Sequence, residues 1–332
     1  MRCPTLKELS LAPAGKTGWP WTEESKELPD TMPDGKPWPK ISIITPSYNQ
    51  GSFLEETIRS VLLQGYPDLE YIIIDGGSAD NSKEIIKKYE KWLAFWVSEK
   101  DKGQSDAINK GFKHANGEIF AWLNSDDTYE PNALGEVAIE MNSHSDIDVI
   151  SGQCRAFGYH WGSYMVPPSP LREYTDFLKV GSNWMSEKLI VQPEAFFRKR
   201  AYETVGGVPA SYYAPDGLLW LEMARAKCKF YSVNRHWANI RWHKGRKTET
   251  NELGYAEVSL AAWKYLIKDW DALGDDVKLV ADDIFKAMNI LRESYVKKND
   301  HLNGILKSVL RSPALKIGSF ITRFIRFWKF KK

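Results

Sequence analysis

Short apolar runs alternate with stretches of helical spacing through the first half of this 332-residue chain, and polar loops follow three of the runs. The runs occupy residues 41–45, 70–75, 94–97 and 119–123. Helices are expected between them, at residues 52–62, 82–89 and 104–114. Strands separated by helices of this length form βαβ units, in which the strands run parallel. The expected fold class is therefore α/β, with a Rossmann-type, mostly parallel sheet flanked by helices.

Capping chemistry places two of the helix starts. Ser52 and Glu55 have the spacing of a capping box, so we expect the first helix to begin at Ser52. Pro131 is suited to the first position of the helix after the fourth strand. Further along, residues 230–233 and 240–243 are expected to form separate extended segments on either side of a polar stretch.

Composition excludes several classes of protein. Hydrophobic residues make up 43% of the chain and charged residues 27%, which is ordinary for a globular protein and argues against disorder. The cysteines Cys3, Cys154 and Cys228 are far apart, so neither a disulfide scaffold nor a Cys-ligated zinc site is expected. A polar N-terminus and the lack of a run of about 20 apolar residues argue against a signal peptide and a membrane span. We therefore expect a cytoplasmic protein.

Charge is distributed unevenly. Residues 301–332 hold eight Lys or Arg and no Asp or Glu, so the rest of the chain is net acidic. An acidic body argues against a nucleic-acid partner. Apolar residues at helical spacing in 313–332 predict a basic amphipathic helix, which either lies on an anionic membrane surface or packs on the protein or another subunit.

Two adjacent carboxylates follow the fourth strand, in Asn124-Ser125-Asp126-Asp127. Ligands of parallel sheets bind beyond the carboxyl ends of the strands, where three polar loops should meet. Neighbouring carboxylates repel each other unless a positive charge lies nearby, and Mg²⁺ or Mn²⁺ would supply it. The same four residues are also good turn formers, so an ordinary turn remains an alternative.

Residues 41 to about 245 resemble the family 2 inverting glycosyltransferases, which have a GT-A fold. The segments that carry the resemblance are ISIITPSYNQGSFLEETIRSVLLQGYPDLEYIIIDGGSADNS, SEKDKGQSDAINKGF, GEIFAWLNSDD and QPEAFFRKRAYETVGG. The resemblance implies a GT-A-like sheet, a nucleotide-diphosphate-sugar donor linked to UDP, dTDP or GDP, and a divalent metal. It implies a catalytic domain at 41–250. Composition, apolar spacing and charge add an N-terminal extension at 1–40, a helical region at 251–300 and a basic tail at 301–332.

The resemblance also assigns donor-binding residues. Pro46 and Tyr48 would flank the base, and Asp75 would hydrogen-bond its edge, although Tyr48 could equally be a packing residue and Asp75 a turn residue. Asp126 would lie near the ribose and the metal, and Asp127 would bind the metal. The remaining donor-side residues in these loops are Ser78, Asn124 and Ser125.

A second donor-side motif covers residues 102–109. Lys102 would neutralise phosphate charge and Asp106 would hold a sugar hydroxyl, at a helix N-terminus that favours anions. Many relatives carry Arg where this chain has Ile108, so an Arg contact to the base is absent or comes from elsewhere. The alternative is an ordinary first turn of a helix with solvated charges.

Asp216 is the matching catalytic base, in the segment 213–221. A positioned carboxylate can take the proton from the acceptor hydroxyl. Relatives usually have a second acidic residue two positions on, where this chain has Leu218. The alternative is that Asp216 caps the following helix, which Asp favours.

The basic segment 241–248 contains a candidate metal ligand, His243, and two candidate diphosphate ligands, Arg241 and Lys247. The alternative is a solvated basic loop. Gln192 would border the acceptor, and aromatic side chains such as Trp161 and Trp184 could stack on sugar faces there, although most such residues pack in cores.

The expected function is thus metal-dependent transfer of a sugar to a hydroxyl of a glycan or lipid-linked glycan in cell-surface polysaccharide synthesis, with the enzyme cytoplasmic or peripheral on the inner face of the plasma membrane. One alternative is a non-catalytic nucleotide-sugar-binding or scaffold protein, which the residue Leu218 supports. Another is a nucleotidyltransferase, which would normally show a Gly-rich basic signature near the first strand. A dehydrogenase is disfavoured because no Gly-x-Gly-x-x-Gly follows any expected strand.

Overall fold

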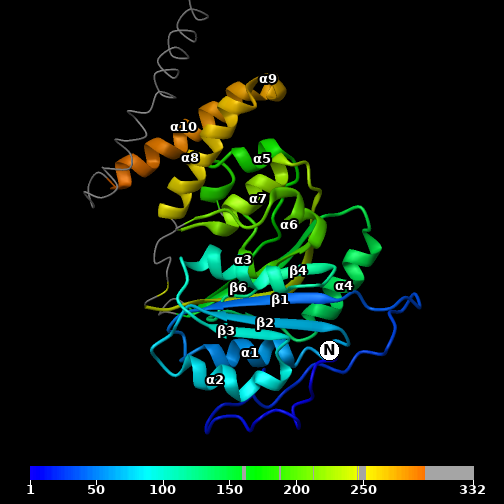
Figure 1. Cartoon of the computed structure of the whole chain (residues 1–332). Coiled ribbons are helices and arrows are strands. Elements are labelled where there is room, and N and C mark those ends of the chain that lie inside the picture. Colours follow the sequence, from blue (N-terminus) through cyan, green and yellow to red (C-terminus); the bar gives the residue numbers. More distant parts are fainter. Residues whose placement is uncertain (159–161, 187, 212, 245, 247–251, 296–332) are drawn as a thin grey trace, which may run out of the picture. The chain divides into compact units, whose positions relative to one another are not determined.

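The computed structural model describes residues 1–158, 162–186, 188–211, 213–244, 246 and 252–295 (Figure 1). The chain divides into two compact units, which are described separately. The first comprises Met1–Tyr174 and Glu187–Glu249, and contains the whole sheet. The second comprises Thr175–Ser186 and the chain from Thr250 onward.

The sheet begins with a parallel half. Its strands are β1 (Ile41–Ser47), β2 (Leu69–Asp75), β3 (Phe95–Ser98) and β4 (Ile119–Trp122), in the order β3-β2-β1-β4. Strand β1 pairs in parallel with both β2 and β4, and β2 pairs in parallel with β3. This order places the first strand of the chain at the centre, with its apolar side chains fully buried.

The second half of the sheet is mixed. Its strands are β5 (Thr128–Tyr129), β6 (Val149–Gly158), β7 (Ser163–Val166), β8 (Ala195–Arg198) and β9 (Phe230–Trp242). Strand β8 joins the halves by pairing antiparallel with β4 and β6, and β9 then pairs in parallel with β6 and antiparallel with β5. The expected α/β fold with a flanked, largely parallel sheet is confirmed.

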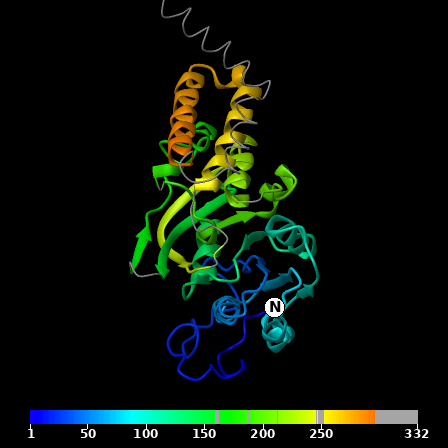
Figure 2. The ribbon, with the colours of Figure 1, turned by 90° about the vertical axis from the view of Figure 1, so that its left-hand side faces the viewer.

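Helices cover both faces of the sheet, as alternation along β1 requires. Ile41 and Ile43 point toward α1 (Leu54–Leu62) and α2 (Ser82–Tyr89), with which they share one apolar core. Ile44 points the other way, toward α3 (Gln104–His114), where a Cβ on Gly111 would come within 2.4 Å of its Cγ2. Figures 1 and 2 show α1 and α2 on one side of the strands and running alongside them.

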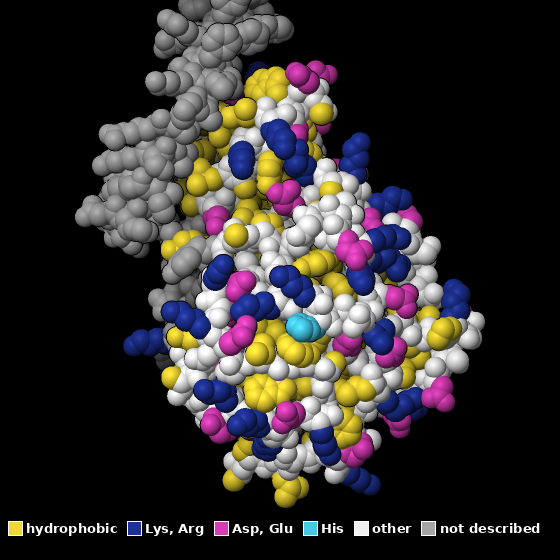
Figure 3. Space-filling model, in the orientation of Figure 1, with side chains coloured by type: hydrophobic (Ala, Val, Ile, Leu, Met, Phe, Trp, Pro, Cys, Tyr) yellow, Lys and Arg dark blue, Asp and Glu magenta, His cyan; other side chains and the backbone are white. Residues whose placement is uncertain are grey.

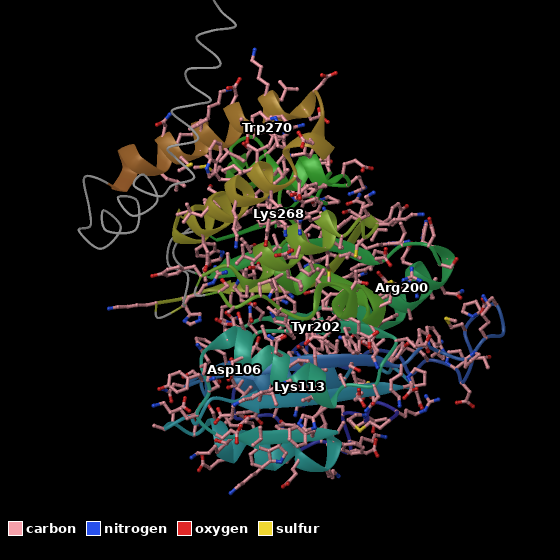
Figure 4. The ribbon with its side chains drawn as sticks, turned by 45° about the horizontal axis from the view of Figure 1, so that its top comes forward. Asp106, Lys113, Arg200, Tyr202, Lys268 and Trp270 are labelled. Atoms are coloured by element: carbon pink, nitrogen blue, oxygen red, sulfur yellow. The ribbon has the colours of Figure 1, made fainter. Side chains whose placement is uncertain are left out.

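The remaining elements of the first unit are short. They are η1 (Glu90–Trp92), α4 (Ala133–Ser143), η3 (Gln192–Glu194), α6 (Lys199–Val205) and α7 (Pro215–Arg225). Tyr202 of α6 donates a hydrogen bond of 2.9 Å to Asn109 of α3, so these two helices lie against each other (Figure 4).

The N-terminal residues are held on α1 by a buried arginine. Arg59 has no exposed surface, and its guanidinium donates to the carbonyl oxygens of Ser10, Pro20 and Trp21 at 2.9–3.0 Å. Trp21 and Trp38 are buried, and the Trp19 indole donates to the Tyr129 carbonyl oxygen at 2.8 Å. Residues 1–40 therefore pack on the body through their tryptophans.

Two expected helix starts are wrong. Helix α1 begins at Leu54 with Phe53 as its N-cap, and no side chain caps it. Glu55 instead pairs with Lys88 at 2.5 Å and accepts a hydrogen bond from Tyr89 at 2.8 Å, so it is not available for a capping box. Helix α4 begins at Ala133 with Asn132 as its N-cap, two residues beyond Pro131.

The second unit is helical. It contains most of α5 (Tyr174–Leu178), then η2 (Trp184–Ser186), α8 (Glu252–Lys268), α9 (Trp270–Leu273) and α10 (Asp276–Tyr295). Gly274, with a φ of 53°, separates α9 from α10. Asp283 of α10 accepts the backbone N–H groups of Gly181 and Ser182. The predicted helix at 313–332 lies outside the described residues.

Among the residues that the structure describes, no helix combines the length and apolarity needed to span a bilayer.

Candidate active site

The polar loops after β1, β2 and β4 meet at one edge of the sheet, as expected. The last residue of β1, Ser47, is level with Asp75, the last residue of β2. On the other side of β1, Leu123 donates its backbone N–H to the Ile44 carbonyl oxygen at 2.8 Å. The segment Asn124–Asp127 therefore leaves β4 at nearly the same level as the other two loops.

Asp75 is fully buried and surrounded by donors. Its carboxylate accepts the Ser78 backbone N–H at 2.9 Å, the Ser78 hydroxyl at 2.5 Å and the Ser98 hydroxyl at 2.6 Å. The Ser78 hydroxyl also accepts the backbone N–H of Asn49 at 2.8 Å. The loops after β1 and β2 are thereby tied together, which fixes the position of the carboxylate at the edge of the sheet.

An aromatic face lies open beside this carboxylate. Tyr48 is 61% exposed, so the alternative that it is a packing residue is not supported by its burial. A Cβ on Gly76 would come within 2.6 Å of Asp101 and 3.4 Å of the Tyr48 ring. The glycine therefore keeps the space between these two side chains open. Pro46 lies within β1, opposite Ile74.

Asp127 is nearly completely buried, and its pKa reflects this. Burial, followed by the neighbouring Asp126, raises the pKa of the carboxyl to about 7. The Arg246 charge, the Arg241 backbone N–H at 2.9 Å and the Asn124 amide at 3.3 Å act in the opposite direction. The Asp126 charge thus opposes the ionisation of Asp127, in line with the repulsion that the sequence suggests.

Asp126 pairs with His243. The His243 Nε2 lies 3.1 Å from an Asp126 oxygen, and this hydrogen bond raises the pKa of the imidazole. The imidazole also packs on Phe53, with ring centroids 4.4 Å apart. Strand β9 therefore brings His243 to the acidic loop, as we name the segment Asn124–Asp127, although His243 follows Asp126 by 117 residues.

Arg246 belongs to the same group, because its charge acts on Asp127, and no specific role for it is predicted above. Its guanidinium lies 4.2 Å from the centre of the Trp242 ring. The Arg246 Nη1 is buried and has no hydrogen-bond partner among the described residues. The signal was present in the basic segment 241–248, which singles out no one arginine.

A chain of hydrogen-bonded side-chain amides, from Gln104, Asn124 and Gln192, supports the acidic loop. Gln104, the first residue of α3, donates to the Asn124 side-chain oxygen at 2.7 Å. The Asn124 amide donates in turn to Gln192 at 2.9 Å, and the Gln192 amide donates to the Trp122 carbonyl oxygen. Gln192 is 6% exposed and Ser125 is 4% exposed, so both are largely closed to solvent.

Lys102 and Asp106 lie at the start of α3, whose N-cap is Gly103. Figure 4 labels Asp106 on this helix. The Asp106 carboxylate accepts the Lys102 backbone N–H at 3.1 Å and pairs with Lys110 at 3.5 Å. The first of these bonds is the main reason that the pKa of Asp106 is lowered. Asp106 therefore closes the first turn of its helix, as the ordinary-helix alternative expects, and the Lys102 side chain is exposed.

Asp216 lies in the first turn of α7, and the alternative that it is the N-cap is wrong. The helix begins at Pro215 and its N-cap is Ala214, which leaves Asp216 as the second helical residue. Four residues on, Trp220 stacks on Trp122 with ring centroids 5.8 Å apart. The stack ties the middle of α7, one turn beyond Asp216, to the strand that leads into the acidic loop.

The three remaining sequence candidates are Trp184, Trp161 and Lys247. Trp184 belongs to the second unit, where it is 4% exposed and its indole donates to the Phe177 carbonyl oxygen at 2.9 Å. Trp161 and Lys247 lie outside the described residues.

The residues at the acidic loop fit a hard divalent cation whose coordination shell is completed by substrate phosphates. In the described part of the chain, no three His, Cys, Asp or Glu side chains form a metal cage. Mg²⁺ typically uses one or two carboxylates together with substrate phosphates, and Mn²⁺ also accepts carboxylates and imidazole. Asp126 and Asp127 supply two adjacent carboxyl groups of that kind, and the His243 imidazole lies 3.1 Å from Asp126.

The charges elsewhere give no sign of a nucleic-acid surface on the face that Figure 3 displays. Basic and acidic side chains are interspersed there among apolar ones. A nucleic-acid-binding protein instead gathers its positive charge into a patch or stripe.

Comparison with known proteins identifies the family to which the sheet and its loops belong. Residues 42–206 match the family model described as glycosyl transferase family 2. An uncharacterized glycosyltransferase of Nostoc sp. is 35% identical over 123 residues, which are 34% of this chain and 38% of that protein. A candidate teichuronic acid biosynthesis glycosyltransferase of Bacillus subtilis, TuaG, is 38% identical over 29% of this chain and 39% of its own length. The match thus spans less than half of these curated relatives.

Solved structures share the fold at low sequence identity. Residues 1–349 of S. aureus TarS, in complex with UDP-GlcNAc, match with a TM-score of 0.58 and 17% identity, over 77% of this chain and 73% of that chain. The mannosyltransferase PcManGT from Pyrobaculum calidifontis, in complex with GDP-Man and Mn²⁺, matches with a TM-score of 0.55 and 16% identity, over 90% and 88% of the two chains. The chain belongs to glycosyl transferase family 2 and has a GT-A-like fold.

Proposed function

We propose that this glycosyltransferase moves a sugar from a nucleotide-diphosphate-sugar to an acceptor hydroxyl, with inversion at the anomeric carbon and with a divalent metal. The observation that carries the proposal is the meeting of Asp75, Asp126 and Asp127 at one edge of the sheet. Asp75 is a buried carboxylate held by hydrogen-bond donors, and it would supply a site for the nucleotide base. Asp126 and Asp127, next to the His243 imidazole, would supply a site for a metal-bound diphosphate.

The donor nucleotide would bind between the loops after β1 and β2. The exposed Tyr48 ring can stack on a base, and Asp75 retains acceptor capacity for a base N–H group. Pro46 and Ser78 complete this end of the site. A donor linked to UDP, dTDP or GDP is supported by the titles of the similar structures, which name UDP-GlcNAc for TarS and GDP-Man for PcManGT.

The diphosphate would lie over the acidic loop. Asp127, Asp126 and His243 would hold Mn²⁺ or Mg²⁺, which would act as a Lewis acid on the diphosphate oxygens. Arg246, whose buried Nη1 has no hydrogen-bond partner in the described chain, Lys102 and Lys247 would add positive charge around the same oxygens. Asn124, Ser125 and Asp106 would contribute polar contacts to the ribose and sugar.

Asp216 would act as the general base. Its position in the first turn of α7, whose Trp220 is stacked on the strand leading to the acidic loop, supports this role. The carboxylate would take the proton of the acceptor hydroxyl while that oxygen attacks the anomeric carbon from the face opposite the diphosphate.

The acceptor would be a hydroxyl of a glycan or of a lipid-linked glycan. Gln192 borders the acidic loop, and Trp161 and Trp184 remain acceptor-side proposals. A role in cell-surface polysaccharide synthesis is supported by the name of TuaG. In that setting, residues 313–332 would bring the enzyme to an anionic membrane surface on the inner face of the plasma membrane.

Thermal unfolding with nucleotides tests the donor site. UDP, GDP, dTDP and CMP are added at millimolar concentration, with and without Mn²⁺. One of UDP, GDP or dTDP should raise the melting temperature by mass action, more so with Mn²⁺. If none of them shifts melting, the donor site is wrong.

The variant Asp216→Asn tests the chemistry. It should retain the nucleotide-induced shift in melting and lose sugar transfer by at least about 100-fold, which is the range of general-base catalysis. Unchanged output in a strain that carries this variant would instead support a non-catalytic, sugar-nucleotide-binding protein.

A further inference from the structure

One arginine contacts both residues of the acidic pair. The Arg241 backbone N–H donates to Asp127 Oδ1 at 2.9 Å, and its guanidinium Nε donates to the Asp126 carbonyl oxygen at 3.1 Å. The guanidinium carbon also lies 5.1 Å from the centre of the Phe53 ring and 4.6 Å from that of Phe157. Arg241 is therefore fixed by three kinds of contact to the place where the metal would bind.

Glu56 of α1 supplies the counter-charge for this arginine. Its carboxylate lies 3.0 Å from the Arg241 Nη2, and the two side chains are only 21% and 16% exposed. A guanidinium held between two rings with little water around it needs such a partner. The pair leaves Arg241 with its charge largely compensated from the side of α1.

The next residue of the same helix holds the same loop. The Thr57 hydroxyl donates to the Asp127 carbonyl oxygen at 2.7 Å, and Thr57 is fully buried. Asp127 thus accepts two hydrogen bonds: its carboxylate accepts the Arg241 backbone N–H, and its carbonyl oxygen accepts the Thr57 hydroxyl of α1. Glu56, which pairs with Arg241, and Thr57, which bonds Asp127 directly, are consecutive residues of α1.

We propose that Glu56 is a positioning residue that keeps Arg241 bound to the acidic loop, so that Asp126 and Asp127 are presented to the divalent cation. The inference rests on the proposed function and replaces the direct contact of Arg241 with the donor that the sequence suggests. Without Glu56, the guanidinium is free to pair with the Asp126 or Asp127 carboxylate and to compete with the cation for it.

The variant Glu56→Gln tests this role, and Glu55→Gln is its matched control. Glu55 is the preceding residue of α1 and also forms an ion pair, with Lys88, but within the described chain it makes no hydrogen bond or ion pair with the acidic loop or β9. In Glu56→Gln we expect the Mn²⁺ concentration for half-maximal donor turnover to rise roughly tenfold or more, the range for residues that support metal ligands. In Glu55→Gln it should stay at the wild-type value.

Two readouts do not depend on turnover. Direct titration of Mn²⁺ in the presence of UDP should show the same loss of affinity in Glu56→Gln. Hydrogen–deuterium exchange at the Arg241 amide, which donates to Asp127, should be faster in Glu56→Gln and unchanged in Glu55→Gln. The double variant Glu56→Gln/Arg241→Gln should lose no more Mn²⁺ affinity than the more severe of the two single variants, because the two residues act as one unit.

The results separate this inference from the proposed function. Wild-type Mn²⁺ affinity and unchanged exchange at Arg241 in Glu56→Gln would overturn the positioning role, even if that variant melts at a lower temperature. If the wild-type protein binds neither UDP, GDP nor dTDP with Mn²⁺, the proposed function fails. The exchange measurement then still decides whether Glu56 fixes Arg241 to Asp127.

Discussion

Trp220 of α7 stacks on Trp122 at the end of β4, with ring centroids 5.8 Å apart and an angle of 19° between the rings. Both side chains are at most 1% exposed. Asp216 precedes Trp220 by one turn of helix, and Asn124 follows Trp122 by two residues. The stack therefore couples the position of the proposed base to that of the acidic loop, although the two belong to distant parts of the chain.

We expect Trp220→Phe to separate these two elements. The smaller ring leaves a cavity and should cost roughly 1–3 kcal/mol of unfolding free energy. Because Asp216 moves with α7, kcat should fall about ten- to a hundredfold while the KM for the donor stays the same. Trp263→Phe, at a 5% exposed position in the second unit, is the control and should reduce stability without this change in kcat. Equal kinetics of the two variants would argue against the coupling.

The raised pKa of Asp127 predicts how metal binding depends on pH. A metal binds the ionised carboxylate, and the pKa of this group is about 7. Mn²⁺ affinity should therefore fall about tenfold for each unit of pH below 7 and level off above it. Calorimetric titration of Mn²⁺ with UDP between pH 5.5 and about 8.5 measures this slope. A flat profile would show that Asp127 is not the titrating ligand.

The same group affects stability in the metal-free protein with the opposite trend. The pKa of Asp127 is higher in the folded chain than its ordinary value of 3.8, so the folded chain binds the proton more tightly than the unfolded chain. This contribution favours the folded state at low pH and is lost as the pH rises from about 4 to about 7. Asp127→Asn should remove that part of the slope in urea unfolding.

Glu194 offers a second test of burial, away from the metal ligands. It is fully buried, and burial raises the pKa of its carboxyl well above the usual range. Its Oε1 accepts the Val191 backbone N–H at 3.1 Å, which a glutamine can also do. Glu194→Gln should match wild type in stability at low pH and exceed it increasingly as the pH rises and the carboxyl is forced to ionise. Parallel stability curves for the two proteins would contradict the raised pKa.

Arg59 is expected to be one of the most sensitive positions in the first unit. In Arg59→Met, the buried carbonyl oxygens of Ser10, Pro20 and Trp21 lose their donor, which should cost about 3 kcal/mol or more. Trypsin should then cleave the native protein faster after Lys16. Arg2→Gln, which removes exposed ion pairs with Glu27 and Asp30, should cost about 1 kcal/mol at most. Similar losses in both variants would argue against the role of Arg59.

Local patterns in the sequence were sufficient for much of the first unit. Helices α2 and α3 have the predicted bounds because their apolar spacing is decided within the segment. Residues 230–242 form one strand and not two segments, because β9 continues through its polar middle by pairing with β6 across register shifts at Ser151–Cys154. The failed capping box has a similar cause, since the partners of Glu55 lie more than 30 residues away.

In the site, too, the residues that lie in local motifs could be predicted and those that depend on distant partners could not. The acidic pair and Asp75 could be found because each follows an apolar run in a recognisable motif. Glu56 could not, because its partner Arg241 is 185 residues away, and nothing in LEETIRS distinguishes Glu56 from Glu55. Arg246 was hidden in the same way among the other positive charges of its segment.

Arg59 recognises the path of the N-terminal residues and not their side chains, because carbonyl oxygens are common to every amino acid. Substitutions at Ser10 or Pro20 that keep the backbone in place would leave this anchor intact. A deletion between them would carry an oxygen out of its reach. The spacing of this segment is thus constrained far more tightly than its composition.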